Sequence, residues 1–298
     1  MRLPRFQYHD PGTLEEAYEL LEAANGGGQI LAGGTDLLVN MKKGMLSPEH
    51  VISLSRIRRL GKIAATEGTF RIGACVTAAD LNESEGVRRE LQALAIGAGS
   101  LGSPLVRNLA TLGGNLVSAR PAADLPPSLI AYGARVVLKS RDGERIVPLE
   151  EFIQGPGETV KAPEEILSEV LVDVPPLYSG GGYVKLGVRR VLEISIVNVA
   201  AFLSLDRPDG AIQSARVVLG AVGPVPLRAP AAEGVLVGER PGEALFARAA
   251  EAAVQDARPI DDFRASAEYR REMVRVLARR ALEMAFGDAK ERELRRWL

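Results

Sequence analysis

The sequence is poor in the residues that build disulfides and metal centres. Its 298 residues include one cysteine, Cys75, and two histidines, His9 and His50. A single cysteine cannot form an intrachain disulfide, and it cannot supply the four thiolates that normally hold an iron–sulfur cluster. The two histidines lie far apart in the chain without an HExxH-type spacing. A zinc site is therefore not expected.

The chain also lacks a charge excess and long apolar runs. Its formal net charge is −1, so electrostatics give no reason to expect a nucleic-acid or membrane partner. No segment approaches the roughly 20 apolar residues of a membrane span, and the first residues have no apolar core typical of a secretory signal. With 46% apolar and 25% charged residues, we expect a soluble, cytoplasmic protein of two domains. Export together with a partner's signal stays open.

Two glycine-rich turns stand out from this ordinary composition. They read Ala32-Gly33-Gly34-Thr35-Asp36 and Thr111-Leu112-Gly113-Gly114-Asn115. Glycine pairs beside hydroxyl and carboxylate or amide groups open the backbone, so that N–H groups can surround a phosphate without obstruction by Cβ atoms. Each pair alone is more commonly a tight connection. Two of them, each after an apolar stretch, suggest a dinucleotide held between two lobes.

Local patterns place both turns in a mixed helix and sheet context. Thr13 and Thr77 are each followed three residues later by an acidic residue, which predicts two helix caps. Strands are predicted at residues 29–32, 51–54, 70–74 and 169–174, and a hairpin joins residues 135–139 to 146–147. A helix is expected at residues 37–43, stopped by Gly44, and another near Pro126 and Pro127. The predicted lobes are about 1–56 and 57–175.

The remainder of the chain, residues 176–298, has a different pattern. Residues 183–186, 194–205 and 215–221 read as strands of a small antiparallel sheet, and the chain is helical from residue 243 onward. The helix is expected to bury one apolar face against the sheet. That face comprises Tyr269, Met273, Val276, Leu277, Ala281 and Met284. Residues 290–296 are predicted to be a solvated helix end.

A literal GxGxxG motif occurs at Gly97, Gly99 and Gly102. A Rossmann turn must follow a strand and open a helix, whereas the residues before Gly97 have a helical pattern and Pro104 follows closely. Asp124 superficially fits the acidic residue that binds ribose. We nevertheless interpret the motif as accidental.

Taken in order, several motifs resemble the FAD-binding (medium) subunit of the xanthine dehydrogenase and carbon monoxide dehydrogenase family of molybdenum hydroxylases. The resemblance covers essentially the whole chain. The stretches that carry it are Leu31-Ala32-Gly33-Gly34-Thr35-Asp36, Ile72-Gly73-Ala74 with Thr77, Val106-Arg107-Asn108-Leu109-Ala110-Thr111-Leu112-Gly113-Gly114-Asn115, Pro121 with Asp124, Tyr183-Val184-Lys185 with Arg189 or Arg190, and Asp261-Asp262-Phe263-Arg264-Ala265-Ser266-Ala267-Glu268-Tyr269-Arg270.

The resemblance implies an α+β fold: a two-lobed FAD-binding domain of the vanillyl-alcohol-oxidase (PCMH) type, followed by a C-terminal antiparallel sheet with helices. It also implies cofactor-binding residues. Those from the first turn are Ile30, Leu31, Ala32, Gly33, Gly34, Thr35, Asp36 and Leu37, and those from the second are Thr111, Gly113, Gly114 and Asn115.

Four more residues match positions near the cofactor in that family. Asp124 matches a residue that hydrogen-bonds FAD, although it is also placed to cap the helix that contains Pro126. Lys185 matches a lysine near the isoalloxazine, where a cation would stabilise reduced flavin, although an exposed strand lysine is the simpler interpretation. Leu101 and Leu167 match residues that pack on the flavin, although leucines are more often core residues.

The family further implies what the chain does and with which partners. It is expected to be the oxidoreductase subunit that carries FAD in a hetero-oligomer with a large molybdopterin-binding subunit and a small [2Fe–2S] subunit. A dimer of heterotrimers is one arrangement of such a hetero-oligomer. Substrate hydroxylation is expected on a partner chain. No histidine or cysteine lies near the first turn, so the resemblance implies dissociable FAD, and one cysteine excludes the extra cluster found in one branch. A stand-alone FAD oxidase and a cofactor-free assembly subunit are the alternatives.

Overall fold

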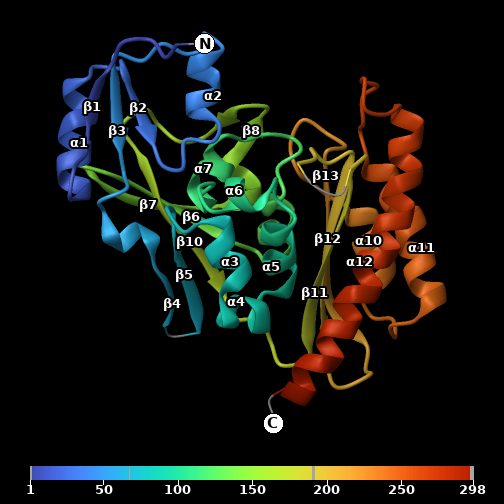
Figure 1. The fold of residues 1–298 in the computed structure, drawn as a ribbon. Coiled ribbons are helices and arrows are strands. Elements are labelled where there is room, and N and C mark those ends of the chain that lie inside the picture. The colour runs from blue at the N-terminus through green and yellow to red at the C-terminus, as the bar shows by residue number, and fades with distance from the viewer. Residues whose placement is uncertain (1, 67, 190–191, 296–298) are drawn as a thin grey trace.

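The computed structural model describes residues 2–66, 68–189 and 192–295, which form three packed units (Figure 1). The first unit is a three-stranded parallel sheet in the order β1-β3-β2, and α1 and α2 connect its strands. Its elements are β1 (Gln7–His9), α1 (Leu14–Ala23), β2 (Gly28–Leu31), α2 (Leu37–Lys42) and β3 (His50–Ser53). The predicted strands and helices of this lobe are confirmed, whereas β1 was not predicted.

The second unit is built on a five-stranded antiparallel sheet in the order β4-β5-β10-β6-β7. Helices from the middle of the chain pack on it and carry the second glycine turn. The elements are η1 (Arg58–Gly61), β4 (Ile63–Thr66), β5 (Thr69–Gly73), α3 (Ala78–Glu83), α4 (Glu85–Glu90), α5 (Gln92–Gly99), α6 (Pro104–Arg107), α7 (Leu112–Val117), α8 (Leu125–Ala131), β6 (Arg135–Ser140), β7 (Gly143–Pro148), α9 (Leu149–Phe152), β8 (Ile153–Gly155), β9 (Glu158–Thr159) and β10 (Ile166–Asp173).

Both predicted helix caps are present. The hydroxyl of Thr13 accepts the N–H of Glu16, and Thr77 forms a reciprocal capping box with Asp80. The Glu16 carboxylate instead accepts the N–H of Gly12 at 2.7 Å. The literal GxGxxG has no Rossmann context, because Gly97 and Gly99 lie inside α5.

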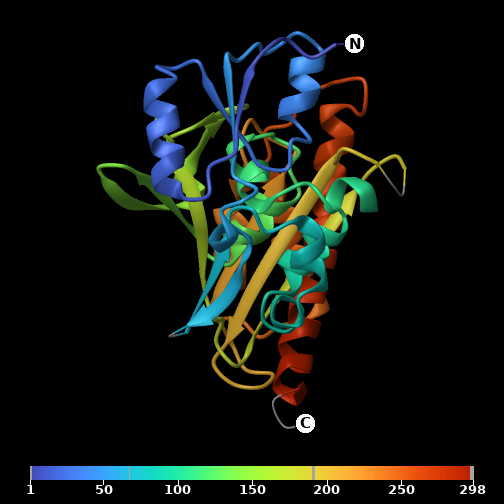
Figure 2. The same cartoon turned by 60° about the vertical axis from the view of Figure 1, so that its left-hand side comes forward.

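The third unit is an antiparallel sheet in the order β11-β12-β13-β14. The C-terminal helices cover one face, and α5 and α8 of the second unit pack on the other. Figures 1 and 2 show the long α12 running beside this sheet, while the small parallel sheet lies at the other side of the molecule. The elements are β11 (Ser179–Leu186), β12 (Val197–Leu205), β13 (Ile212–Gly220), β14 (Leu227–Arg228), α10 (Pro230–Leu236), α11 (Glu243–Ala253), η2 (Val254–Asp256) and α12 (Ala267–Arg295).

The predicted apolar face of α12 is confirmed at Leu277 and Ala281, which are buried, and at Met273, which packs on the core of the C-terminal unit. It is wrong at Tyr269, which is 45% exposed, and the buried face is richer in alanine than predicted. A Cβ atom at Gly180 or Gly182 of β11 would lie 2.3 or 2.2 Å from helix backbone oxygens, so strand and helix backbones approach too closely for large side chains. The buried face comprises Val274, Leu277, Ala278, Ala281, Leu282, Ala285 and Ala289.

The predicted solvated end of this helix is also wrong at Arg292, whose side chain is 2% exposed. Its guanidinium forms an ion pair with Glu90 at the end of α4 and donates to the Pro175 carbonyl at 3.0 Å. The last helix therefore ties the C-terminal sheet to the second unit. Arg190 of the quoted motifs and Arg296 of the predicted helix end lie outside the described residues.

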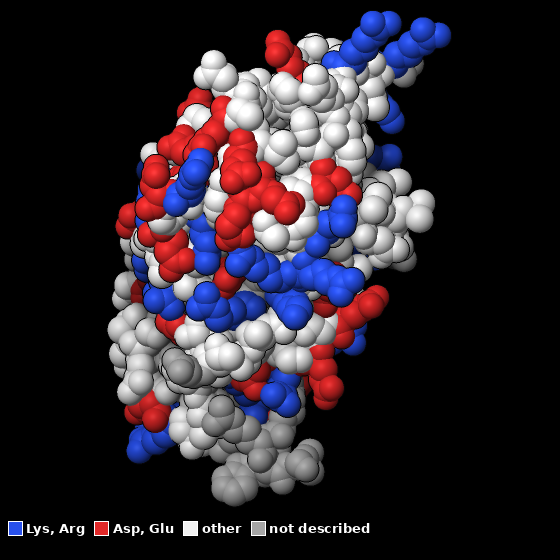
Figure 3. Space-filling view, turned by 90° about the vertical axis from the view of Figure 1, so that its left-hand side faces the viewer, with Lys and Arg blue, Asp and Glu red and all other residues white. Residues whose placement is uncertain are grey.

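The face that carries α1 has charges of both signs (Figure 3). Acidic side chains lie above a band of basic ones in this view. Two acidic residues of α1 form ion pairs with basic residues of the second unit. Arg59 lies 3.5 Å from Glu15, and Arg141 lies 2.9 Å from Glu22. These pairs are largely solvated, so each contributes at most about 1 kcal/mol to stability.

Candidate functional site

A cavity of about 770 Å³ lies between the first two units, within the size range of sites for small molecules and cofactors. Most of the predicted cofactor-binding residues line it. Those on its wall are Ile30, Ala32, Gly33, Gly34, Thr35, Asp36, Leu37, Leu101, Thr111, Gly113, Gly114, Asn115 and Leu167. Leu31, Asp124 and Lys185 are not among the lining residues.

The first glycine turn presents a row of unused backbone donors. In the described part of the chain, the N–H groups of Gly33, Gly34, Thr35 and Asp36 make no hydrogen bond. Gly34 has a φ of +73°, which places it in the left-handed region that glycine adopts without strain. Successive free N–H groups in such a turn form a concave site for an anion.

In the second glycine turn, most backbone N–H groups already donate hydrogen bonds to other groups of the protein. Leu112 N–H donates to the Val76 carbonyl and Gly113 N–H to the Ala74 carbonyl, both at 2.8 Å, while Gly114 N–H donates to the Thr111 hydroxyl at 3.1 Å. A Cβ atom at Gly113 would lie 2.7 Å from the Ala74 Cβ. This glycine therefore permits close packing against the segment after β5. The two turns are not equivalent, because the first leaves four successive N–H groups without a hydrogen bond, whereas the second uses those of Leu112, Gly113, Gly114 and Asn115.

The second turn contributes a side-chain acceptor instead. The Oδ1 atom of Asn115 is buried and has no hydrogen-bond partner within the described residues. Buried polar atoms are nearly always paired, and Asn115 lines the cavity. A ligand that brings a donor to this oxygen would satisfy it.

The turns meet where the first unit contacts the second. Gly33 approaches Leu109 so closely that a Cβ atom would lie 1.8 Å from the Leu109 carbonyl oxygen. The Asp36 carboxylate accepts the Ser118 hydroxyl at 3.2 Å and lies 3.9 Å from the Arg120 guanidinium. Ser118 and Arg120 follow the second turn in the sequence, and their contacts with Asp36 join the second turn to the first.

Besides the two turns, the cavity is lined by a set of apolar residues and by several charged ones. Cys75, Leu101, Ile166 and Leu167 line the apolar part, and burial raises the pKa of the Cys75 thiol to about 11. The thiol is therefore uncharged at neutral pH.

Glu165 and Lys161 are two of the charged residues on the wall. Hydrogen bonds from Arg145 hold the pKa of Glu165 below its ordinary value, and the two side chains are 2.6 Å apart. Lys161 donates to the carbonyls of Ala162 and Glu165, and burial lowers its pKa. The carboxylate and the ammonium thus both have partners beside the cavity.

Asp124 and Lys185 form a buried pair behind the cavity wall. The Lys185 ammonium donates to the Asp124 carboxylate at 2.9 Å and to the Ser100 carbonyl at 3.1 Å. Tyr183 and Ser195 also donate to this carboxylate, at 2.9 and 3.0 Å. Burial raises the pKa of Asp124, while Lys185 and the other donors oppose that rise.

The sequence left two alternatives to cofactor contact open: a helix cap for Asp124 and an exposed strand lysine for Lys185. The structure supports neither alternative. Asp124 stands at the start of α8 but makes no side-chain capping bond. The Lys185 side chain is 12% exposed, so it is not a surface lysine. The pair adjoins the cavity through Ser100, the residue before Leu101.

Several lining residues were missed by sequence reasoning. Six of them come from the segment around β9 and the start of β10, and no local motif marks these six. The missed lining residues are Gln29, Asn40, Leu46, Leu54, Ala74, Cys75, Val106, Ala110, Val117, Gly157, Glu158, Thr159, Lys161, Glu165 and Ile166.

Two negative findings apply to the part of the chain that the structure describes. It contains no cluster of three or more histidine, cysteine, aspartate or glutamate side chains that could hold a metal ion. It also contains no helix long and apolar enough to cross a membrane.

Comparison with known protein families gives two matches. Residues 4–175 match the FAD binding domain in molybdopterin dehydrogenase, and residues 182–285 match the CO dehydrogenase flavoprotein C-terminal domain. Together they span nearly all of the three units.

Individual relatives agree with these family matches. The xanthine dehydrogenase FAD-binding subunit of Escherichia coli O157:H7 is 31% identical over 286 residues, covering 95% of this chain and 96% of that protein. The carbon monoxide dehydrogenase medium chain of Hydrogenophaga pseudoflava is 32% identical over 284 residues, covering 95% and 98%.

Solved structures show the same fold. Carbon monoxide dehydrogenase from Hydrogenophaga pseudoflava, in a form lacking the Mo-pyranopterin moiety, matches with a TM-score of 0.92 at 33% identity over 97% of this chain and 99% of that one. Quinoline 2-oxidoreductase from Pseudomonas putida 86 matches with a TM-score of 0.90 at 28% identity, covering 97% and 100%. The α+β fold expected from the sequence is confirmed, and the chain belongs to the family of FAD-binding oxidoreductase subunits of the molybdenum hydroxylases.

Proposed function

We propose that this chain holds dissociable FAD in the cavity between its first two units and relays electrons within a molybdenum hydroxylase complex. Electrons would arrive from [2Fe–2S] clusters on a small subunit and leave to an external acceptor. A large molybdopterin-binding subunit would hydroxylate the substrate. The observation that best supports the FAD site is the row of free N–H groups at Gly33, Gly34, Thr35 and Asp36, which suits the pyrophosphate anion.

FAD, when bound, supplies the redox chemistry, and the chain supplies binding and orientation. We assign the pyrophosphate to the first turn and a donor group of the cofactor to Asn115 Oδ1. Leu101 and Leu167 would pack on the flat rings. Lys185 is proposed to act through Asp124, because the paired charges fix the Ser100 carbonyl next to Leu101. Neither side chain is assigned direct contact with the cofactor.

The assembly is proposed on the same basis. We expect a hetero-oligomer of large, medium and small subunits, with a dimer of heterotrimers as one arrangement and the cytoplasm as its location. We also propose that residues 1–175 and 176–298 are separate domains. The change from β10 to β11, between Asp173 and Ser179, supports this division.

Spectroscopy of the purified chain tests the function. We expect the yellow absorbance of FAD, released unmodified by denaturation, and reduction of the flavin only when the small subunit and reduced clusters are present. A colourless chain that still joins the complex would favour an assembly subunit. Rapid oxidation of a small substrate by the chain alone would favour a stand-alone oxidase.

Asn115→Ala tests the placement of the cofactor. Loss of one hydrogen bond should raise the FAD Kd about tenfold, measured by fluorescence titration. The unfolding free energy of the FAD-free chain should change by less than about 1 kcal/mol, since Oδ1 has no partner there. The control is Asn108→Ala, because Asn108 is exposed and does not line the cavity. Equal FAD affinity in both variants would contradict the assignment.

A further inference from the structure

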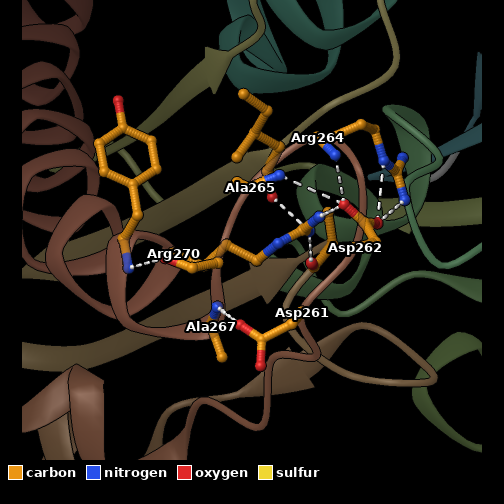
Figure 4. A network of polar contacts seen from close by, with 10 residues as sticks. Asp261, Asp262, Arg264, Ala265, Ala267 and Arg270 are labelled. Carbon is orange, nitrogen blue, oxygen red and sulfur yellow. Dashed lines mark hydrogen bonds and ion pairs between the residues drawn. The ribbon is translucent and has the colours of Figure 1, made fainter.

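Charged side chains that are withdrawn from solvent usually have partners within the same chain. The Asp262 carboxylate, on the turn before α12, is an example (Figure 4). It accepts the backbone N–H of Arg264 at 2.8 Å, and the guanidinium groups of Arg264 and Arg270 also donate to it. Lys161, on the wall of the cavity, differs from this pattern.

The Lys161 ammonium keeps one donor free beside the cavity. It has three N–H groups, and two of them donate to the carbonyls of Ala162 at 2.7 Å and Glu165 at 3.1 Å. The Glu165 carboxylate is occupied by Arg145 at 2.6 and 2.9 Å and by the Ala162 N–H at 2.7 Å. In the part of the chain that the structure describes, the third N–H has no acceptor. A ligand that brings an acceptor would complete the set.

The loop that carries Lys161 is fixed at both ends. Arg145 on β7 donates to the Val160 carbonyl at 2.7 Å, one residue before Lys161. The same guanidinium holds the Glu165 carboxylate at the other end of the loop. A group that is held in place before its ligand arrives loses little conformational entropy on binding.

The start of the first glycine turn adjoins the segment that holds Leu101. A Cβ atom at Gly33 would lie 1.8 Å from the Leu109 carbonyl oxygen, so the two backbones are in contact. Arg107, two residues before Leu109, donates to the Leu101 carbonyl at 3.1 Å. Because Leu101 is assigned to the flavin rings, the flavin half of the cofactor extends from this side of the turn.

The end of the same turn adjoins the segment that holds Lys161. The Asp36 carboxylate accepts the Ser118 hydroxyl at 3.2 Å, and Ala119, the next residue, accepts the N–H of Gly157 at 3.0 Å. The chain reaches Lys161 four residues later, still on the cavity wall. With the pyrophosphate on the turn, the adenosine half of FAD is left for this side.

The residues on this side suit a neutral ring better than a further phosphate. Three carboxylates line it and disfavour a second anion. They belong to Asp36, Glu158 and Glu165. Apolar lining residues lie next to this side in the sequence, namely Leu37, Val117 and Ile166. Adenine is flat and uncharged at neutral pH, and its ring nitrogens accept hydrogen bonds.

We propose that Lys161 donates a hydrogen bond to a ring nitrogen of the FAD adenine and so selects the adenosine half of the cofactor. The inference rests on the proposed FAD site and adds a specificity residue to it. A hydrogen bond from a charged donor contributes more than one between neutral groups. FMN lacks the adenosine half, so Lys161 favours FAD over FMN.

Lys161→Met tests the proposal, because it removes the ammonium and keeps a long side chain. Binding to the FAD-free chain is measured by competition against FAD fluorescence, with ADP and inorganic pyrophosphate as probes. The Kd of ADP should rise about tenfold. That of pyrophosphate, which has no adenine, should stay within about twofold and thereby show that the first turn is intact. The Kd of FAD should rise with that of ADP, and that of FMN should not change.

Two further variants complete the test. Lys161→Arg keeps a charged donor and should recover most of the ADP affinity. The matched control is Lys139→Met on β6, where the lysine side chain is 25% exposed, pairs with Glu144 at 2.9 Å and does not line the cavity. Its Kd values for ADP and pyrophosphate should both stay within about twofold of the wild type.

Two outcomes would overturn the role of Lys161. An unchanged Kd for ADP in Lys161→Met would limit the side chain to its contacts with Ala162 and Glu165. An equal rise for ADP and pyrophosphate would mean that Lys161 contacts a phosphate or only shapes the site. A wild-type chain that binds neither FAD nor ADP would instead refute the proposed FAD site, and this inference with it.

Discussion

Gly33→Ala is expected to raise the FAD Kd about 100-fold. The added Cβ would lie 1.8 Å from the Leu109 carbonyl oxygen and 2.7 Å from its carbon. Both are backbone atoms, so a change of side-chain conformation cannot relieve the clash. The two turns must move apart. Overpacking of this kind costs typically 1–3 kcal/mol, and a cost near the upper end corresponds to the predicted change in affinity. Fluorescence titration of the FAD-free variant measures it.

Gly61→Ala is the matched control for this substitution. Gly61 lies in η1 of the second unit, and nothing lies within 4 Å of the position its Cβ would take. The FAD affinity of Gly61→Ala should equal that of the wild type. If Gly33→Ala also bound FAD with unchanged affinity, the contact between Gly33 and Leu109 would not be needed to form the site.

Glu90→Gln is expected to lower the free energy of unfolding by about 3–5 kcal/mol. The Arg292 guanidinium is 2% exposed and the Glu90 side chain is 12% exposed, so the substitution removes the ion-pair partner of a buried cation. The hydrogen bonds that Arg292 makes to the Pro175 carbonyl at 3.0 Å and the Ser179 hydroxyl at 3.4 Å are to neutral groups. Urea unfolding of the FAD-loaded chain provides the measurement.

Arg89→Gln distinguishes the contribution of the buried pair between Arg292 and Glu90 from that of an exposed pair on the same carboxylate. Arg89 also contacts Glu90, at 3.0 Å, but its side chain is 58% exposed. Removing it should cost less than about 1 kcal/mol, because exposed ion pairs contribute little. Equal losses for Arg89→Gln and Glu90→Gln would show that the end of α12 does not hold the units together.

Local sequence predicted those elements whose signals are local. Caps at Thr13 and Thr77 and a glycine stop at Gly44 act within a few residues of the helix they bound. Strand β1, strand β14 and helix α10 were missed. The two strands have three residues or fewer, so their patterns are too short to stand out.

The sequence predicted which glycine turns form the site. It did not predict which of the two turns offers free N–H groups. Both turns could be read from the sequence, because the spacing of glycine with hydroxyl and acidic residues is local. The N–H groups of the first turn stay free, whereas two N–H groups of the second turn donate to the carbonyls of Val76 and Ala74. This difference depends on which segments pack beside each turn. The position of Lys185 also depends on distant segments. The sequence was compatible with an exposed lysine or with a cofactor contact, and the structure places the side chain against Asp124.

The sequence by itself determined the composition class, the caps, the two glycine turns and, through the order of its motifs, the family. Each of these depends on residues close together in the chain or on their order along it. Only the tertiary structure decided the buried face of α12, the burial of Arg292, the free oxygen of Asn115 and the place of Lys161 on the cavity wall. The physical reason is that burial and hydrogen-bond pairing depend on which distant backbone segments approach, as Gly180 and Gly182 do to α12.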